Sequence, residues 1–171
     1  MSYCGIILSS EKSKETKVSF LSEESLDVFS VDSNEEIVEL LEEFEPSIVS
    51  VDVGTTQGPD TFTSDEEDLK EKGYNFTPNS FETKKVRRLE VLKEHALRQL
   101  GRKSADFIRF DPVITAEELS LHSDSALESL GIETGSITDS REFDSVLGAV
   151  TARFYDEGQF EKNGIVIPES L

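Results

Sequence analysis

The stretch Ser-Ile-Val-Ser-Val-Asp-Val at residues 47–53 decides the fold class of this 171-residue chain. Its apolar density is typical of a strand buried on both faces, and such strands occur in sheets that helices cover on both sides. Asp52 stands near the end of the stretch, where burying a carboxylate is costly unless it is paired or bound to metal. Residues 47–53 therefore predict a central strand that carries a candidate functional acid.

The segments on either side of this strand predict an ordered series of elements. Three short apolar segments separated by polar breaks precede it. Between them and the central strand, apolar residues at helical spacing predict a helix that Ser33 or Asn34 can cap. Helical patterns then alternate with further apolar segments. The predicted elements are strands 3–9, 17–21 and 26–31, helix 35–44, strand 47–53, helix 81–100, strand 107–110, short helices 115–117 and 123–129, helix 143–155 and a final edge strand or β-like tail at 164–168.

A three-strand meander followed by alternating helices and strands indicates an α/β fold, with a mixed central sheet and helices on both faces. The ribonuclease H-like fold is the commonest architecture with this order of elements. In that fold, carboxylates from the first strand, the fourth strand and the last helix converge on divalent metal. We find no internal repeat, so residues 1–171 are predicted to form one ribonuclease H-like domain.

Residues 54–80 differ in character from the rest of the chain. They are rich in glycine and proline, hold few apolar side chains and include the acidic run at residues 65–68. A loop of this length inside a compact domain is more often functional or mobile than decorative. The sequence therefore predicts an acidic, mobile insertion loop at 54–80.

The charge of the chain is strongly negative but unevenly distributed. There are 36 acidic against 17 basic side chains, which gives a net charge of −19, yet residues 84–103 alone carry about +6 and leave −25 elsewhere. A basic segment in an acidic protein is typical of a site for a phosphate-bearing partner. The alternative is a solvated helix face that pairs with acidic neighbours. The candidate nucleic-acid contacts are Lys84, Lys85, Arg87, Arg88 and Arg98.

Composition also limits the environment of the protein. No apolar run approaches the ~18 residues that a membrane span needs, and the first residues lack the pattern of a secretory signal. The single cysteine, Cys4, cannot form an internal disulfide. A cytoplasmic protein without a membrane partner is expected, and its acidic surface suits solubility in a salty cytoplasm.

Carboxylates are the candidate ligands, because the sequence contains no paired cysteine or histidine cluster. Asp52 and Asp144 are the candidate catalytic and metal-binding residues. Asp139 is a weaker candidate for a metal ligand, and we interpret it first as a helix cap. Oxygen ligands of this kind select Mg²⁺ or Mn²⁺, and paired carboxylates that hold such ions can hydrolyse a phosphodiester. The alternatives are structural: Asp52 can accept hydrogen bonds from the turn that follows it, and the helix dipole favours Asp144.

The C-terminal residues resemble a known family. Residues 142–152, with Gly158 and residues 164–168, are similar to the C-terminal signature of the DUF429 family, a group of predicted ribonuclease H-like nucleases. Residues 47–53 are similar to its acid-bearing strand, which implies that Asp52 is the family's acid. The family places another Asp in the first strand, where this chain has Ile7.

The resemblance implies a Mg²⁺- or Mn²⁺-dependent nuclease, or a descendant of one whose activity is weakened or lost, because the missing acid normally bridges both metals. The second interpretation is a non-catalytic module that binds nucleic acid or protein through the basic helix at 84–103. Small-molecule phosphate transfer is the third.

Overall fold

The structure, a computed structural model, describes residues 1–9, 15–23, 25–53, 64–74 and 83–170. Its elements follow the predicted order closely. They are β1 (Tyr3–Ile7), β2 (Thr16–Leu21), β3 (Leu26–Val31), α1 (Asn34–Phe44), β4 (Ile48–Val51), α2 (Ser64–Glu71), α3 (Thr83–Leu100), a 3-10 turn (Gly101–Lys103), β5 (Asp106–Arg109), α4 (Pro112–Leu119), α5 (Asp124–Glu128), α6 (Ser140–Asp156), β6 (Phe160–Lys162) and β7 (Val166–Pro168).

The central sheet has five strands in the order β3-β2-β1-β4-β5. The first three strands form the predicted antiparallel meander, and β4 and β5 run parallel to β1. Gly5 of β1 lies between Ser19 of β2 and Ser50 of β4. The mixed sheet is therefore confirmed, with β1 and β4, the strands that would carry catalytic acids, at its centre.

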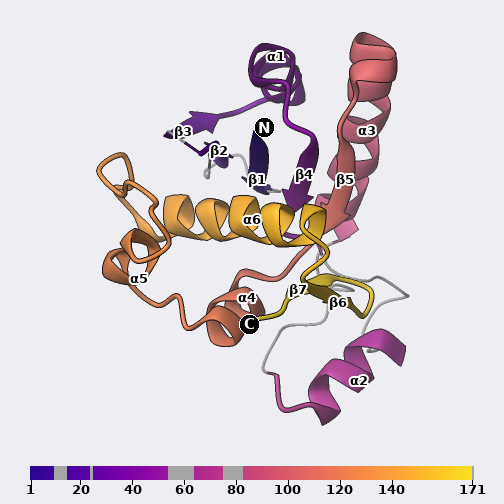
Figure 1. Ribbon diagram of the computed structural model, residues 1–171. Coiled ribbons are helices and arrows are strands. Elements are labelled where there is room, and N and C mark those ends of the chain that lie inside the picture. The colour runs from indigo at the N-terminus through magenta and orange to yellow at the C-terminus, as the bar shows by residue number, and fades with distance from the viewer. Residues whose placement is uncertain (10–14, 24, 54–63, 75–82, 171) are drawn as a thin grey trace.

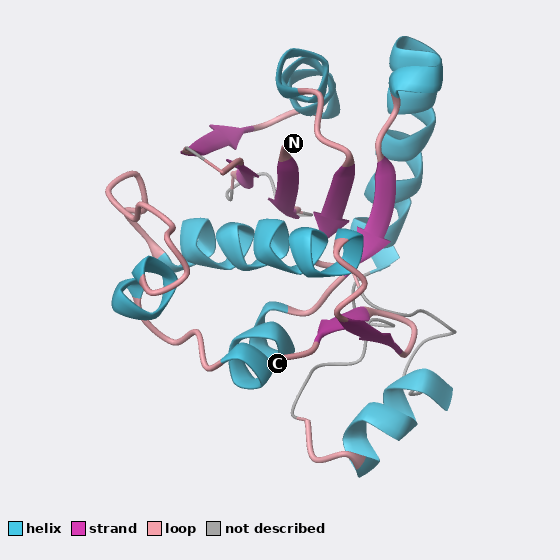
Figure 2. Cartoon of the chain, viewed as in Figure 1, coloured by secondary structure: helices cyan, strands magenta, loops and turns pink. Residues whose placement is uncertain are grey.

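Helices cover both faces of this sheet, as predicted. Alternate side chains of β1, including Cys4 and Ile6, pack with the apolar stripes of α1 and α3 in one buried cluster. Ile7, the residue that follows Ile6, packs with α6 in a second cluster on the opposite face. Figures 1 and 2 show α6 lying across the sheet strands, with α1 and α3 beyond them. Period-two alternation in β1 thus separates the two layers of the core.

The helix α6 lies unusually close to β1 because both elements present glycine at their crossing. A Cβ atom built on Gly5 would stand 1.9 Å from the carbonyl oxygen of Ser145, and one on Gly148 would stand 2.9 Å from the Cα of Gly5. The two glycines therefore permit a backbone-to-backbone approach of α6 to β1.

Two predicted caps are also confirmed. The hydroxyl of Ser33 accepts the N–H of Glu36 at the start of α1, and Asp139 accepts the N–H of Glu142 at the start of α6. Glu142 in turn accepts the N–H of Thr138, which closes a capping arrangement around the first turn of α6.

The prediction of a continuous loop over 54–80 is wrong for its middle part. Residues 64–71 form α2, and Leu69 is buried against Ile114 of α4 and Ile167 of β7. A single leucine within an acidic run produces no apolar periodicity, so the sequence pattern did not indicate a helix. Residues 54–63 and 75–82 of the predicted loop lie outside the described residues.

The final strand also differs from its prediction. Residues 166–168 pair antiparallel with β6 in a separate two-stranded sheet, and do not form an edge of the central sheet. The sequence pattern of β6, Phe-Glu-Lys, is too short and polar to indicate a strand without its partner. Among the described residues, no helix combines the length and apolar character needed to cross a membrane.

Candidate functional site

Asp52 lies one residue beyond the C-terminal end of β4, beside the end of β1. Its N–H donates to the carbonyl oxygen of Ile6 at 3.1 Å, which extends the pairing of the two strands. One carboxylate oxygen, Oδ1, accepts the N–H of Leu8 at 2.8 Å, and the other, Oδ2, pairs with the Lys85 ammonium of α3. The side chains of Asp52 and Lys85 are only 8% and 11% exposed. A buried, hydrogen-bonded ion pair therefore closes this end of the sheet.

The Lys85 ammonium supplies the positive charge that a buried carboxylate at this position requires. Desolvating a carboxylate costs several kcal/mol unless an opposite charge and hydrogen bonds compensate it, and Asp52 has both. Lys85 is predicted to contact phosphate, but its ammonium instead lies against Asp52 at the C-terminal end of β4. Asp52 accepts a backbone N–H from Leu8; the turn that was its predicted structural partner, residues 54–56, lies outside the described residues.

Ile7 occupies the position where the resemblance to DUF429 implies an acid. Its side chain is 4% exposed and packs among Phe110, Val146 and Leu147, between β1 and α6. The side chain is hydrocarbon and so offers no oxygen ligand. The end of β1 consequently contributes to the core and not to an acidic cluster.

Asp139 caps α6 and lies next to a second buried lysine. The hydrogen bond from the N–H of Glu142, with the Lys17 ammonium 3.6 Å away, holds the pKa of Asp139 below its usual value. Lys17 stands on β2 opposite Ile7 and also donates to Ser30 at 2.6 Å. The interpretation of Asp139 as a cap is confirmed by this hydrogen bonding, and its carboxylate is engaged with the helix.

Asp144 lies beyond the first turn of α6, five residues after the cap Asp139, and is half-buried. Burial raises its pKa to about 6, and the neighbouring carboxylate of Asp111 adds to the rise while Arg141 opposes it. Asp111 caps α4, where Oδ1 accepts the N–H of Val113 at 2.9 Å. Sequence reasoning missed this neighbour, although Asp followed by Pro112 is a typical start of a helix. Asp144 and Asp111 thus form a pair of like charges that repel each other.

These acids do not fit a two-metal site. Both oxygens of Asp52 are engaged by Leu8 and Lys85, and Ile7 supplies no ligand. Within the described ranges, no three histidine, cysteine, aspartate or glutamate side chains gather as a metal-holding group. Among the described residues, the donor set that paired Mg²⁺ or Mn²⁺ ions would need is therefore not assembled.

The candidate nucleic-acid contacts on α3 divide into two groups. Lys84 and Arg87 are exposed, and Arg98 is exposed and paired with Glu94. Arg88 instead turns inward and donates to Asn34 at 3.0 Å and to Thr16 at 2.7 Å. This contact ties α3 to α1 and β2.

Arg88 and Lys85 serve internal contacts, and burial lowers the pKa of Arg88 below its usual value. The solvent-facing cations at the start of α3 are thus Lys84 and Arg87.

Substituting Asp144 by asparagine is expected to stabilise the protein at pH 8 and to change little at pH 4. The raised pKa means that folded Asp144 holds its proton where the unfolded chain has lost it, so stability falls as pH rises from about 4 to 6. Asparagine removes that loss, which we put at about 1 kcal/mol after allowing for solvent screening of a half-buried group. Urea unfolding at both pH values checks this, with Glu133→Gln as an exposed control. Equal effects of the two substitutions at pH 8 would contradict the prediction.

Comparison with known proteins identifies the fold. No protein-family model and no curated protein sequence matches the chain. Two solved structures of Thermus thermophilus RuvC are similar to it. One is in complex with Holliday junction substrate, with a TM-score of 0.61, 16% identity and coverage of 98% of this chain and 99% of that chain. The other has a TM-score of 0.58 and 13% identity, with coverage of 98% and 99%. The chain therefore has the predicted ribonuclease H-like fold.

Proposed function

We propose that this protein is a ribonuclease H-like domain that binds nucleic acid without two-metal hydrolysis. The observation that carries the proposal is the Lys85 ammonium on the carboxylate of Asp52 at the end of β4. In a nuclease whose metal ligands are acidic side chains, this end of β4 would carry negative charge. Bound cations would have to neutralise that charge before a phosphate could approach. Here a lysine of the protein supplies that charge.

The nucleic-acid part of the proposal rests on the fold and on α3. One of the two RuvC structures contains Holliday junction substrate, and the likeness extends over nearly the whole of both chains. Lys84 and Arg87 are three residues apart on α3, so they share one side of the helix. Their helix also delivers Lys85 to the sheet edge. A phosphate backbone held by Lys84 and Arg87 would therefore lie near the ion pair of Asp52 and Lys85.

The double substitution Lys84→Glu/Arg87→Glu is expected to weaken binding to a fluorescein-labelled four-way DNA junction by about tenfold or more at 0.1 M salt. Each cation lost from a phosphate contact reduces the slope of affinity against salt concentration by about one, so the slope should fall by about two. Fluorescence anisotropy over a salt series measures both quantities.

The matched control is Arg102→Glu/Lys103→Glu, which changes the net charge equally at the opposite end of α3. It should retain most of the affinity. Equal losses in the two double variants would show that only net charge matters and would overturn the assignment of the binding face. Absence of junction binding by the unmodified protein at low salt would overturn the proposed function itself.

A second candidate is metal-dependent phosphodiester hydrolysis centred on Asp144. The observation that favours it is the repulsion between Asp144 and Asp111, which a divalent cation would relieve. Mg²⁺ or Mn²⁺ at millimolar concentration should then raise the melting temperature and support slow cleavage of the labelled junction, and Asp144→Asn should abolish both effects. Small-molecule phosphate transfer and membership of the DUF429 family have no further support.

A further inference from the structure

The strand β5 ends the order of the central sheet, and none of the described strands pairs with the edge that faces away from β4. Asp106 donates its N–H to the carbonyl oxygen of Ser47, and Phe110 donates to Val51. Because a parallel ladder uses alternate residues, the N–H and carbonyl groups of Phe107 point to the other side, away from β4. An edge of this kind can pair with an additional extended segment.

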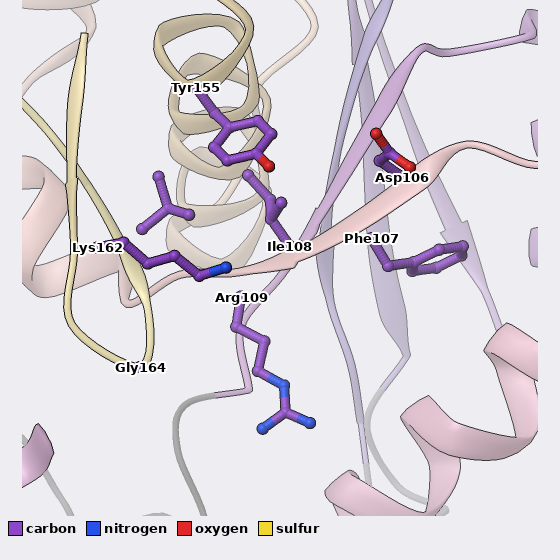
Figure 3. Close-up of a pocket in the computed structure, with 8 residues that line it drawn as sticks. Asp106, Phe107, Ile108, Arg109, Tyr155, Lys162 and Gly164 are labelled. Carbon is purple, nitrogen blue, oxygen red and sulfur yellow. The ribbon is translucent and has the colours of Figure 1, made fainter. Parts of the chain in front are cut away.

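A cavity of about 380 Å³ adjoins this outer edge of β5 on the α6 face of the sheet. Its charged lining includes Asp106 and, from β6, Lys162, and both side chains are exposed. In Figure 3 the Lys162 ammonium points across the cavity toward Ile108 and Arg109. These two residues form the end of β5 opposite to Asp106, so the lysine and the acid stand at different ends of the strand.

The α3 face of the same edge also mixes charges of both signs with apolar side chains. A cavity of about 580 Å³ on this face is lined by Lys93, two glutamates, Leu97 and Phe107. Leu97 is 62% exposed, and Arg109 lies 3.7 Å from the carboxylate of Glu90. Neither face of the edge is uniformly acidic, basic or apolar. A partner that fits both faces must therefore present charges of both signs itself.

We propose that the outer edge of β5 pairs antiparallel with the same edge of a second copy of this chain, with Phe107 at the two-fold axis. A residue on the axis of such a pair lies opposite itself, so the two Phe107 residues exchange both main-chain hydrogen bonds. The residues on either side lie opposite each other, which places Asp106 of one copy against Ile108 of the other. The central sheets of the two copies would then be continuous across the dimer.

Charge complementarity favours this register and this occupant. Opposite residues of an antiparallel pair point to the same face, with their Cβ atoms about 4.5–5.5 Å apart. Asp106 of one copy would therefore lie beside Ile108 of the other on the α6 face, where the Lys162 ammonium of that other copy points. The two-fold axis forms this contact of opposite charges twice. Centring the pair on Arg109 would instead bring two like charges together.

The overall charge of the chain opposes association, and salt reduces this effect. Each copy carries a net charge of −19, so two copies repel each other. At about 0.3 M salt the Debye length is below ~8 Å, which screens distant carboxylates much more than an acid and a lysine in contact. The inference is independent of nucleic-acid binding, because that proposal uses Lys84 and Arg87 at the start of α3 and not the edge of β5.

The test uses the full chain at about 0.3 M salt and two variants that each reverse one charge, Asp106→Lys and Lys162→Glu. Sedimentation should show a dimer of the unmodified protein. Each variant alone should dimerise about tenfold more weakly or worse, because its own dimer would contain two contacts of like charge. An equimolar mixture of the two variants should dimerise about as tightly as the unmodified protein, since the mixed dimer restores both contacts of opposite charge. Mixing cannot restore a contact within one chain.

The amide of Phe107 locates the contact. In ¹⁵N-labelled protein its hydrogen exchange should slow by about tenfold or more as the protein concentration rises through the dimerisation range. The control Lys84→Glu changes the net charge as Lys162→Glu does, at an exposed residue away from the edge, and should leave dimerisation unchanged.

Three results would overturn the proposal. They are a monomer at every protein concentration, a mixture of the two variants that associates no better than either alone, and a dimer in which the Phe107 amide exchanges as fast as in the monomer. No readout involves DNA, so failure here leaves the proposed function standing.

Discussion

The substitution Lys85→Met is expected to lower the free energy of unfolding by about 3–5 kcal/mol, because removing one partner of a buried ion pair leaves the other charge uncompensated. Asp52 would keep its hydrogen bond from Leu8 but lose the ammonium on its second oxygen. Methionine is similar in length to lysine and apolar, so the effect of lost packing is small. Urea unfolding at pH 7, followed by circular dichroism, measures the loss.

A double-mutant cycle isolates the pair from other effects of the substitution. Lys85→Met/Asp52→Asn removes both charges and should recover part of the stability lost in Lys85→Met alone. The neighbouring Lys84→Met alters an exposed lysine on the same helix and should change stability by less than about 0.5 kcal/mol. If Lys84→Met and Lys85→Met proved equally mild, the Lys85 ammonium would not be a structural replacement for a bound cation.

Most of the fold could be predicted from the sequence because its strands and helices carry strong local patterns. The meander consists of short apolar segments separated by polar breaks, the central strand at residues 47–53 has a high apolar density, and the long C-terminal helix has a capping residue. The elements that escaped prediction, α2 and β6, are short and polar. They are held by contacts such as that of Leu69 with Ile114 and Ile167, which lie far apart in the chain.

The site was harder to predict because charge type does not tell where a side chain points. The sequence grouped Lys85 and Arg88 with Lys84 and Arg87, whereas the structure turns the first two inward. A signal was available: Lys85 lies on the same stripe as Leu89 and the other buried residues of α3, at helical spacing. A lysine on an apolar stripe indicates a buried partner, and Asp52 is the acid that the structure brings to it.

The identity of residue 7, by contrast, is given by the sequence itself as Ile7, and the structure gives the physical consequence of an apolar side chain at this position. An isoleucine at the end of β1 joins the apolar cluster under α6, which fills the space between strand and helix with side chains such as Val146. The electrostatic influence of Asp111 on Asp144 could not be predicted, since Asp111 caps α4 whereas Asp144 belongs to α6, far along the chain.

The substitution Gly5→Ala is expected to cost at least about 4 kcal/mol, because the new methyl group would meet backbone atoms that cannot move independently. The added Cβ would stand 1.9 Å from the carbonyl oxygen of Ser145 and 2.4 Å from the nitrogen of Ala149. Relief would require α6 to lift away from the sheet. The control is Gly135→Ala, where a Cβ meets nothing within 4 Å. Thermal and urea unfolding should leave that control close to the unmodified protein.

If Gly5→Ala fails to fold, the milder substitution Gly148→Ala keeps the prediction testable. Its Cβ would stand 2.7 Å from the ring of Phe110 and 2.9 Å from the Cα of Gly5, so part of the clash falls on a side chain that can be shortened. Overpacking of this kind costs about 1–3 kcal/mol, and adding Phe110→Leu should recover some of it by removing the ring atoms in contact. The contact with Gly5 remains, so recovery must be incomplete. Full recovery in the double variant would show that the ring alone sets the distance between α6 and β1, and that their close backbone approach imposes no constraint.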